Sequence, residues 1–381
     1  MARLARLRRL ALRALLALLA VLAITLLVVK LVWGGGEPYP DVSTAPRLDD
    51  ASVEARLVHD LPLGNVACAP GHRVFFNTHP FAQAHRFRDA TVFELVDGAP
   101  RPYPSLEAQE DLRFVFGMTV DRQGRLWMIA PATLDRERTR LVAFDLATDE
   151  RVVDHHFEPG VARFAQDLRV DPDGRTLYLA DTGAFRFTDA ALLVVDTGDW
   201  SVRRVLDGHA STQPQGWTIR TAHGPHRVGW GLLTFSVGVD GIALSADGAW
   251  LYFATMSHDT LFRIPTAALR DPGRSDAELE AALEEVGPKP LSDGIELMPD
   301  GTVLSTDIEN GGVAAVDPSG ELETWVKRDD VVWADGIARC PDGEVLFTDS
   351  AIPAYLHPLL LPPDRETLAA HAPYALWAFT P

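Results

Sequence analysis

The sequence predicts an all-β protein, a six-bladed β-propeller preceded by one N-terminal transmembrane helix. Two patterns in its 381 residues support this prediction: a β-hairpin motif that recurs six times, and an uninterrupted apolar segment near the N-terminus. The composition agrees, because 47% hydrophobic and 23% charged residues are ordinary for a globular protein and leave ample apolar surface to bury. Only two cysteines are present, which excludes a disulfide framework and a cysteine-based zinc module.

The first segment predicts a membrane anchor. Residues 14–33 are uncharged except for Lys30, and a helix of that length can cross a bilayer core of about 30 Å. Five arginines lie in residues 1–13, so this basic region should stay in the cytoplasm and residues 14–33 should act as a transmembrane signal-anchor. The body would then be periplasmic or extracellular. Secretion after signal cleavage is the alternative, although no clear small-x-small cleavage site precedes Gly34.

The rest of the chain divides into a linker and one repeat domain. Residues 34–50 are rich in Gly, Pro and Asp and are typical of a linker. From residue 51 to 381 we expect the propeller. Its hairpin motif consists of two apolar runs joined in most copies by a turn such as Pro-Asp-Gly or Ala-Asp-Gly. The six copies begin at Asn65, Gly117, Asp167, Asp240, Asp293 and Asp335.

The spacing of these copies predicts the number of blades. They start 52, 50, 73, 53 and 42 residues apart, and a further apolar run often follows each hairpin. A unit of about 50 residues with several strands has the size of a propeller blade. The Trp-Asp and Gly-His signatures of WD40 blades are missing from these positions, which excludes that subtype.

Two segments interrupt the rhythm of the blades. Residues 209–226 account for the 73-residue interval and predict a loop or an extra strand pair over one face of the ring. Residues 275–286 have a Ser N-cap, acidic residues in the first turn and three apolar positions at helical spacing, so we expect a short helix that ends at Gly287.

Cys68 and Cys340 lie in comparable inner strands of the first and last blades, which are neighbours in a closed ring. An oxidising compartment would permit a disulfide. The bond needs Cα atoms within about 7 Å of each other, however, and the spacing of blades makes two buried free thiols our prediction.

Three stretches of this sequence resemble a known group. They begin with Gln-Asp-Leu-Arg-Val-Asp-Pro at Gln166, Gly-Val-Asp-Gly-Ile-Ala-Leu at Gly238 and Trp-Ala-Asp-Gly-Ile at Trp333. They are similar to the propellers of the senescence marker protein/gluconolactonase superfamily, and more closely to bacterial relatives of the major royal jelly and Yellow proteins. The resemblance covers roughly residues 55–380. It implies a six-bladed propeller, within a superfamily that mixes lactone hydrolases, ligand carriers and proteins with no assigned activity.

The resemblance also implies a metal site. The gluconolactonase-like members hold one divalent cation on the propeller axis, and by motif their ligand positions fall on Asn65, Gln166, Asp240 and Asp293. All four are oxygen donors, which suits Ca²⁺ first, with Mg²⁺, Mn²⁺ or Zn²⁺ as alternatives. Asp293 gives the firmest match and, by analogy, would serve as the general base of a hydrolase.

The residues themselves point to the same place. Asp167, Asp240, Asp293 and Asp335 stand at the starts of inner strands, whereas the second Asp of several repeats sits in the hairpin turn and is typical of turns. If the first aspartates converge, their charges raise one another's pKa unless a metal or a cationic ligand neutralises them. We expect Asp167 and Asp335 to contact ligand, together with His209 and Trp217 from the long insertion.

The net charge of the chain excludes one class of partner. The net charge is −18, and because residues 1–36 hold six basic and no acidic residues, the rest carries 29 − 53 = −24. Such a body repels phosphate backbones, so we expect no nucleic-acid partner. We predict a monomer that acts on a small molecule, as a cation-dependent hydrolase of a lactone or similar ester. A non-catalytic binder of amine-type ligands and a protein-interaction platform remain alternatives.

Overall fold

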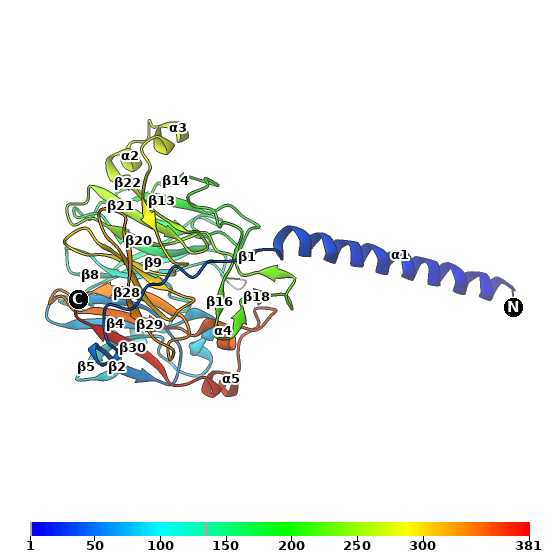
Figure 1. The fold of residues 1–381 in the computed structure, drawn as a ribbon, viewed down its shortest axis with the longest axis horizontal. Helices are drawn as coiled ribbons and strands as arrows, with labels where there is room; N and C mark the ends of the chain where they lie inside the picture. Colours follow the sequence, from blue (N-terminus) through cyan, green and yellow to red (C-terminus); the bar gives the residue numbers. More distant parts are fainter. Residues whose placement is uncertain (1, 134–135) are drawn as a thin grey trace.

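The computed structural model describes residues 2–133 and 136–381 and confirms the all-β propeller (Figure 1). Within these residues, six four-stranded antiparallel sheets form the blades. The innermost strands contact one another in the cyclic order β3, β7, β11, β20, β24, β28 and back to β3, so the ring is closed.

The blades follow chain order, and each has its innermost strand first. The first three blades are β3 (Leu63–Ala69), β4 (Arg73–Thr78), β5 (Val92–Val96) and β6 (Ala99–Pro102); β7 (Met118–Val120), β8 (Arg125–Ala130), β9 (Arg140–Asp145) and β10 (Arg151–His156); and β11 (Ala165–Val170), β12 (Thr176–Asp181), β13 (Ala191–Asp196) and β14 (Val202–Val205). The last three are β20 (Val239–Leu244), β21 (Trp250–Thr255), β22 (Thr260–Pro265) and β23 (Glu284–Pro288); β24 (Ile295–Leu297), β25 (Val303–Asp307), β26 (Gly312–Val316) and β27 (Leu322–Lys327); and β28 (Ala334–Arg339), β29 (Val345–Asp349), β30 (Tyr374–Phe379) and β2 (Val53–His59).

The burial of the strands follows from this arrangement. The second strand of each blade is packed on both faces by the neighbouring blades, so β12 and β21 are buried at every position but the first. The outer strand β10 has one face toward solvent, and its residues alternate between half-buried and exposed. The core therefore lies between the blades rather than at the axis.

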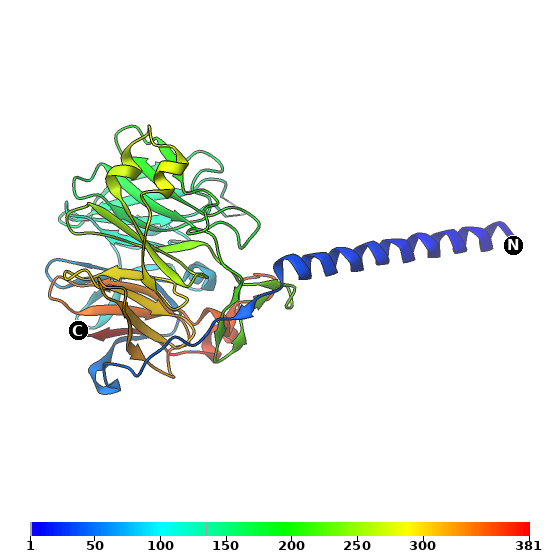
Figure 2. The same ribbon diagram turned by 45° about the horizontal axis from the view of Figure 1, so that its top comes forward.

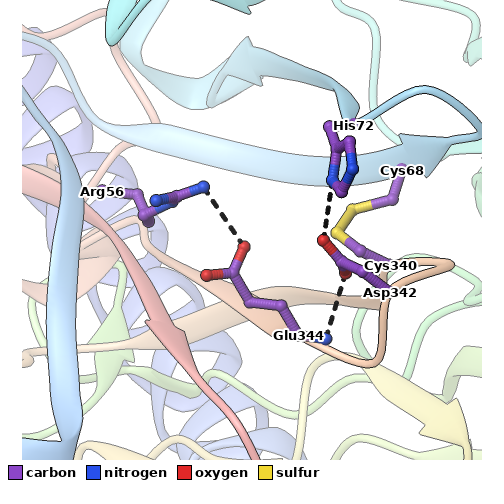
Figure 3. The surroundings of a disulfide bond; sticks show 6 residues. All are labelled: Arg56, Cys68, His72, Cys340, Asp342 and Glu344. Atoms are coloured by element: carbon purple, nitrogen blue, oxygen red, sulfur yellow. Dashed lines mark hydrogen bonds and ion pairs between the residues drawn. A yellow bond between two sulfur atoms is a disulfide. The ribbon is translucent and has the colours of Figure 1, made fainter.

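Two devices close the ring between its first and last blades. The first is the pairing of β2, from the N-terminal part, with β30 at the C-terminus. The second is a disulfide between Cys68 and Cys340, whose Cα atoms are 5.0 Å apart (Figure 3). The prediction of two free thiols was wrong, because inner strands of adjacent blades approach one another far more closely than the average spacing of blades suggests.

Near this disulfide, one polar contact crosses the same boundary and a second lies within the last blade. Nδ1 of His72, in the β3–β4 turn, lies 2.8 Å from Oδ2 of Asp342, in the β28–β29 turn (Figure 3). Arg56 on β2 lies 3.5 Å from Glu344 of the same blade. All these side chains lie at the end of the ring that carries the turns between first and second strands, which we call the turn face.

The opposite end, at which the inner strands begin, carries the long insertion, and we call it the insertion face. The predicted extra strand pair is confirmed there. The insertion holds five two-residue strands: β15 (Trp217–Thr218), β16 (Arg220–Thr221), β17 (Gly224–Pro225), β18 (Arg227–Val228) and β19 (Leu233–Thr234). The same face carries short helices between strands: η2 (Pro80–Ala82), η3 (Ala84–Arg86), η4 (Glu107–Gln109), α4 (Ile352–Tyr355) and α5 (Arg365–Ala370).

The predicted helix over residues 275–286 is shorter in the structure. Two short helices follow β22, namely α2 (Thr266–Arg270) and α3 (Asp276–Glu280). Ser275 caps α3 in a capping box with Glu278, as the N-cap signal predicted. The helix ends early because residues from Glu284 onward pair with β22 as the outer strand β23, so ladder hydrogen bonds replace helical ones.

The N-terminal segment is a long helix followed by an extended stretch. Helix α1 spans Ala2–Trp33, and in the described residues its part from Arg6 is the one helix long and apolar enough to cross a membrane. After it, β1 (Glu37–Pro38) pairs in parallel with β15. The stretch then runs along the fifth blade, where Leu48 N donates to Trp325 O at 3.0 Å, and reaches β2 through η1 (Asp50–Ser52).

Candidate functional site

The side chains at the axis are placed by irregularities in the inner strands. A β-bulge leaves Gln166 as the extra residue of β11 and Asp240 as that of β20. In β28 a similar register shift spans Asp335 and Gly336. A bulge turns its unpaired side chain away from the regular alternation, and here these side chains face one pocket on the axis.

Asp240, Asp293 and Asp335 are each followed by a glycine, which the close packing of neighbouring inner strands requires. A Cβ on Gly241 would lie 2.8 Å from Asp293 O, and one on Gly294 would lie 2.6 Å from Asp335 O. On Gly336 it would lie 2.7 Å from the Cα of Asn65. The Asp-Gly pairs at strand starts are therefore not turns. The aspartate lines the axis, and the glycine lets the next inner strand approach it.

The axial pocket at the insertion face brings six of the eight predicted site residues together. Its volume of about 50 Å³ holds a few water molecules or an ion. The predicted residues that line it are Asn65, Gln166, Asp167, Asp240, Asp293 and Asp335. They come from five of the six blades, so residues up to 270 positions apart in the chain meet here.

The carboxylates of this pocket repel one another in a buried place. Burial raises the pKa of Asp240 well above its usual value, and the charges of Asp293, Asp167 and Asp335 raise it further. Burial and the charge of Asp293 likewise raise the pKa of Asp335 well above its usual value. Oδ2 of Asp240 and Oδ2 of Asp335 are buried and have no hydrogen-bond partner. A positive charge in the pocket would satisfy both oxygens.

Asp293 differs from Asp240 and Asp335 because its carboxylate accepts a hydrogen bond from a buried indole. Burial, together with the charge of Asp167, raises its pKa to about 7, and this rise is opposed by the indole N–H of Trp333, which donates to its Oδ2 at 2.7 Å. Trp333 is itself fully buried against His226 and Phe235 of the insertion. The orientation of this carboxylate is thus fixed by the rigid packing around the indole.

Asp167 is tied into the backbone of the ring. Its Oδ1 accepts from Arg169 at 2.7 Å and from the backbone N–H of Leu168 at 2.8 Å, while its Oδ2 accepts from Ile242 N at 3.0 Å. Burial raises the pKa of Asp167, and the charge of Arg169 opposes that rise. With both oxygens engaged, Asp167 joins β11 to β20 and has less capacity left for a ligand.

Two predicted contact residues lie outside this pocket. Nδ1 of His209 is 2.8 Å from Ser211 Oγ, and its Nε2 is 3.8 Å from Glu280, beside the fourth blade. Trp217 packs edge-on against Tyr39, with 5.1 Å between ring centroids, and its indole donates to Gln215. Both side chains fasten the insertion and the N-terminal stretch to the ring. The residues that line the pocket from this part of the chain are Phe235 and Val237, which lie between β19 and β20.

Sequence reasoning missed His79, which lies in the loop after β4. Its Nδ1 accepts from Phe81 N at 3.2 Å, and its Nε2 lies 3.5 Å from Oδ2 of Asp335. Burial lowers the pKa of His79 to about 3, so the ring is neutral and does not balance the charge of Asp335. No spacing in the sequence marks this histidine. Trp333 had a signal, because it stands two residues before Asp335.

The donors of the axial pocket suit a hard cation in their chemistry. Carboxylate and amide oxygens are the ligands that Ca²⁺ prefers, and the unpartnered oxygens of Asp240 and Asp335 face the pocket. Among the described residues, however, no three His, Cys, Asp or Glu side chains lie close enough together to hold a metal ion. A cation there would need the amide oxygens of Asn65 and Gln166 as well.

A second, apolar cavity adjoins the axial pocket. It has a volume of about 260 Å³ and shares five lining residues with the axial pocket: Phe81, Phe116, Gln166, Phe235 and Val237. Six phenylalanines line it: Phe81, Phe114, Phe116, Phe164, Phe185 and Phe235. The site therefore has an acidic end at the axis and an aromatic end beside it.

Comparisons with known proteins agree with the fold. The family model described as major royal jelly protein matches residues 114–329. No curated protein matches the sequence. A gluconolactonase from Xanthomonas campestris aligns with a TM-score of 0.52 and 15% identity, covering 90% of this chain and 97% of the other. A luciferin-regenerating enzyme aligns with a TM-score of 0.51 and 10% identity, covering 86% and 95%. At these identities the structural likeness shows the fold alone.

Proposed function

The chain belongs to the major royal jelly protein family, and from that premise we propose that it is a divalent-cation-dependent hydrolase of a lactone or similar small ester, with its site in the axial pocket. We propose further that α1 anchors the propeller in a membrane with the body outside the cytoplasm. The arginines before residue 14 support this orientation.

One observation carries the hydrolase proposal. Asp240, Asp293 and Asp335 meet in one small pocket, and two of their buried oxygens have no hydrogen-bond partner. Leaving buried charged oxygens unpaired is costly, whereas a bound cation offsets both their desolvation and their mutual repulsion. The site therefore favours a positive charge over any neutral or anionic occupant.

The residues would divide the work as follows. Asn65, Gln166, Asp240 and Asp293 would hold the cation, with Ca²⁺ as the first candidate. Such an ion supplies Lewis-acid polarisation of a carbonyl and acidification of bound water. Asp293 would also take a proton from the attacking water as the general base.

Calorimetric titration of Ca²⁺ into the chelator-stripped full chain in detergent tests the proposal. We expect one binding site, lost in Asp293→Ala and kept in the matched control Asp247→Ala, an exposed aspartate in a hairpin turn. A panel of lactones and small esters with Ca²⁺, Mg²⁺, Mn²⁺ and Zn²⁺ then tests turnover. Absence of binding for all four ions would contradict the proposal.

A second candidate function is non-catalytic binding of an amine-type ligand. The aromatic rings of Phe81, Phe116 and Phe235 line the same pocket as the aspartates, and ring faces together with carboxylates attract organic ammonium groups. An ammonium group does not need three acidic or histidine ligands around one point, a grouping that is absent from the described residues. Amine affinity without ester turnover would select this function.

A further inference from the structure

The C-terminal end of α1 makes hydrogen bonds and a ring contact with the insertion face of the propeller. Lys30 Nζ donates to Gly34 O at 3.2 Å and to Gly231 O in the β18–β19 hairpin. The Trp33 indole donates to Arg186 O at 3.3 Å, and its ring lies 5.2 Å from that of Phe187. Figures 1 and 2 show α1 leaving the propeller beside this insertion. The apolar helix therefore ends directly on the insertion face, without a free tether.

Large apolar side chains are exposed around that point. Phe187 in the β12–β13 loop is 50% exposed, and Trp230 at the tip of the β18–β19 hairpin is 72% exposed. Leu359, Leu360 and Leu361, which follow α4, are 45–52% exposed. Beyond α1, the other exposed large apolar side chains of the described residues are Val58, Leu106 and Val152.

The exposed side chains of the hairpin and of the leucine segment form one surface because their loops are joined, and Phe187 adjoins it through Trp33. Gly229 N, beside Trp230, donates to Pro358 O at 2.6 Å, which connects the hairpin to the leucine segment. Trp230 has a φ of 52° between two glycines with positive φ, so the backbone of the tip presents this ring outward. We call Phe187, Trp230, Leu359, Leu360 and Leu361 the apolar rim.

A lipid bilayer is the occupant that the geometry favours for this rim. A helix that crosses the membrane and ends at Trp33 places that residue at the interface, and Phe187 is in contact with it. Trp230 lies next to Gly231, which Lys30 contacts. Tryptophan and lysine are typical of the ends of membrane-spanning helices, and an exposed apolar patch of this kind marks an interaction surface.

The rim also leads into the site. Leu360 lines the aromatic cavity, and Phe185 of that cavity stands two residues before Phe187. We propose that the insertion face rests on the bilayer from which α1 emerges, and that the aromatic cavity takes the apolar tail of an amphiphilic ligand whose polar end reaches the axial aspartates. The inference rests on the proposed function for the role of the aspartates. The contact between the insertion face and the bilayer does not depend on whether the protein hydrolyses a substrate.

Site-directed fluorescence tests the surface. The two cysteines are disulfide-bonded and none is free in the described residues, so a cysteine introduced by Leu360→Cys in the full chain can be labelled selectively with an environment-sensitive dye. In phosphatidylcholine vesicles that contain nitroxide-labelled acyl chains, we expect strong quenching. Gln123→Cys, exposed on the turn face, is the matched control and should stay unquenched. Equal quenching at the two positions, or quenching at neither, overturns the membrane contact.

Calorimetry with two lactone probes tests the ligand class. The probes share one ring and differ only in the length of an alkyl tail, and partition into empty vesicles is subtracted. We expect the long-tailed probe to bind roughly tenfold more tightly or better, because each buried methylene adds to affinity. Equal affinities overturn the tail-binding part. Tight binding of the long-tailed probe without hydrolysis would support this inference while contradicting the hydrolase.

Discussion

At the scale of single residues, the Trp333 indole stabilises the charged form of Asp293. Burial favours the neutral acid, and the N–H donated to Oδ2 at 2.7 Å opposes it. Removing a hydrogen bond that favours the carboxylate must raise its pKa further. Because Asp293 has to be ionised to bind a cation, the pH dependence of binding reports on this contact.

We therefore predict that Trp333→Phe shifts the acid limb of Ca²⁺ binding to higher pH by about one to two units, since a hydrogen bond to a charged group is worth about 1.5–3 kcal/mol. Affinity measured by calorimetry from pH 5 to 9 gives the midpoint. Trp325→Phe, in the outer strand β27, serves as a control for the loss of a buried indole. An unchanged midpoint in a folded Trp333→Phe protein would show that the indole does not set the charge of Asp293.

The sequence indicated the axial aspartates but not their individual states. The Asp-Gly pairs at strand starts predicted Asp240, Asp293 and Asp335, and these do converge. Asp167 looked equivalent, yet its partner Arg169 lies in the same strand and points back to it. Whether a carboxylate is paired or free depends on side-chain direction after a bulge, which no residue pattern fixes. His79 was not predicted as a site residue, because it reaches Asp335 only through a loop that comes from another blade.

At the scale of elements, the disulfide links Cys68 in β3 to Cys340, the residue after β28, and the two cysteines are 272 residues apart in sequence. A link between such distant residues strongly restricts the unfolded chain. The pairing of β2 with β30 closes the ring independently, so the fold should survive loss of the bond.

We predict that Cys68→Ala/Cys340→Ala lowers the free energy of unfolding by about 2–4 kcal/mol while the propeller still forms. Denaturant titration followed by circular dichroism measures the difference, and reductant should destabilise the wild type but not the double variant. Equal stability of the two proteins would mean that strand pairing alone closes the ring.

The outer strand of the fourth blade shows where local signals fail. The cap and the apolar spacing predicted a helix through residue 286, and the cap is present at Ser275. The residues from Glu284 onward nevertheless form β23, because the edge of β22 needs a partner. Non-local pairing overrides a weak helical pattern, and a single sequence does not reveal that competition. The cysteine pair was misjudged in the same way, through a distance set by the closed ring.

At the scale of the whole molecule, the repeat predicted the ring because each hairpin needs neighbours to bury both its faces. Six copies in one chain therefore predicted the six blades. The surface that faces the membrane could not be predicted, because Phe187, Trp230 and Leu360 are isolated in sequence and only the fold gathers them. The same gathering makes the axial pocket a property of the ring, since its donors come from five blades.

A cation bound to donors from several blades should thus stabilise the ring as a unit. With free Ca²⁺ at about 100 times its dissociation constant, binding to the folded state alone adds about 2.7 kcal/mol. For a propeller of this size that corresponds to a rise in Tm of about 4 °C. Scanning calorimetry of the chelator-treated chain with and without Ca²⁺ measures it, and Asp240→Asn should abolish the shift. A rise in Tm with an organic amine but not with Ca²⁺, Mg²⁺, Mn²⁺ or Zn²⁺ would replace the hydrolase with the amine-binding function, because either ligand stabilises only through a site that the folded ring assembles.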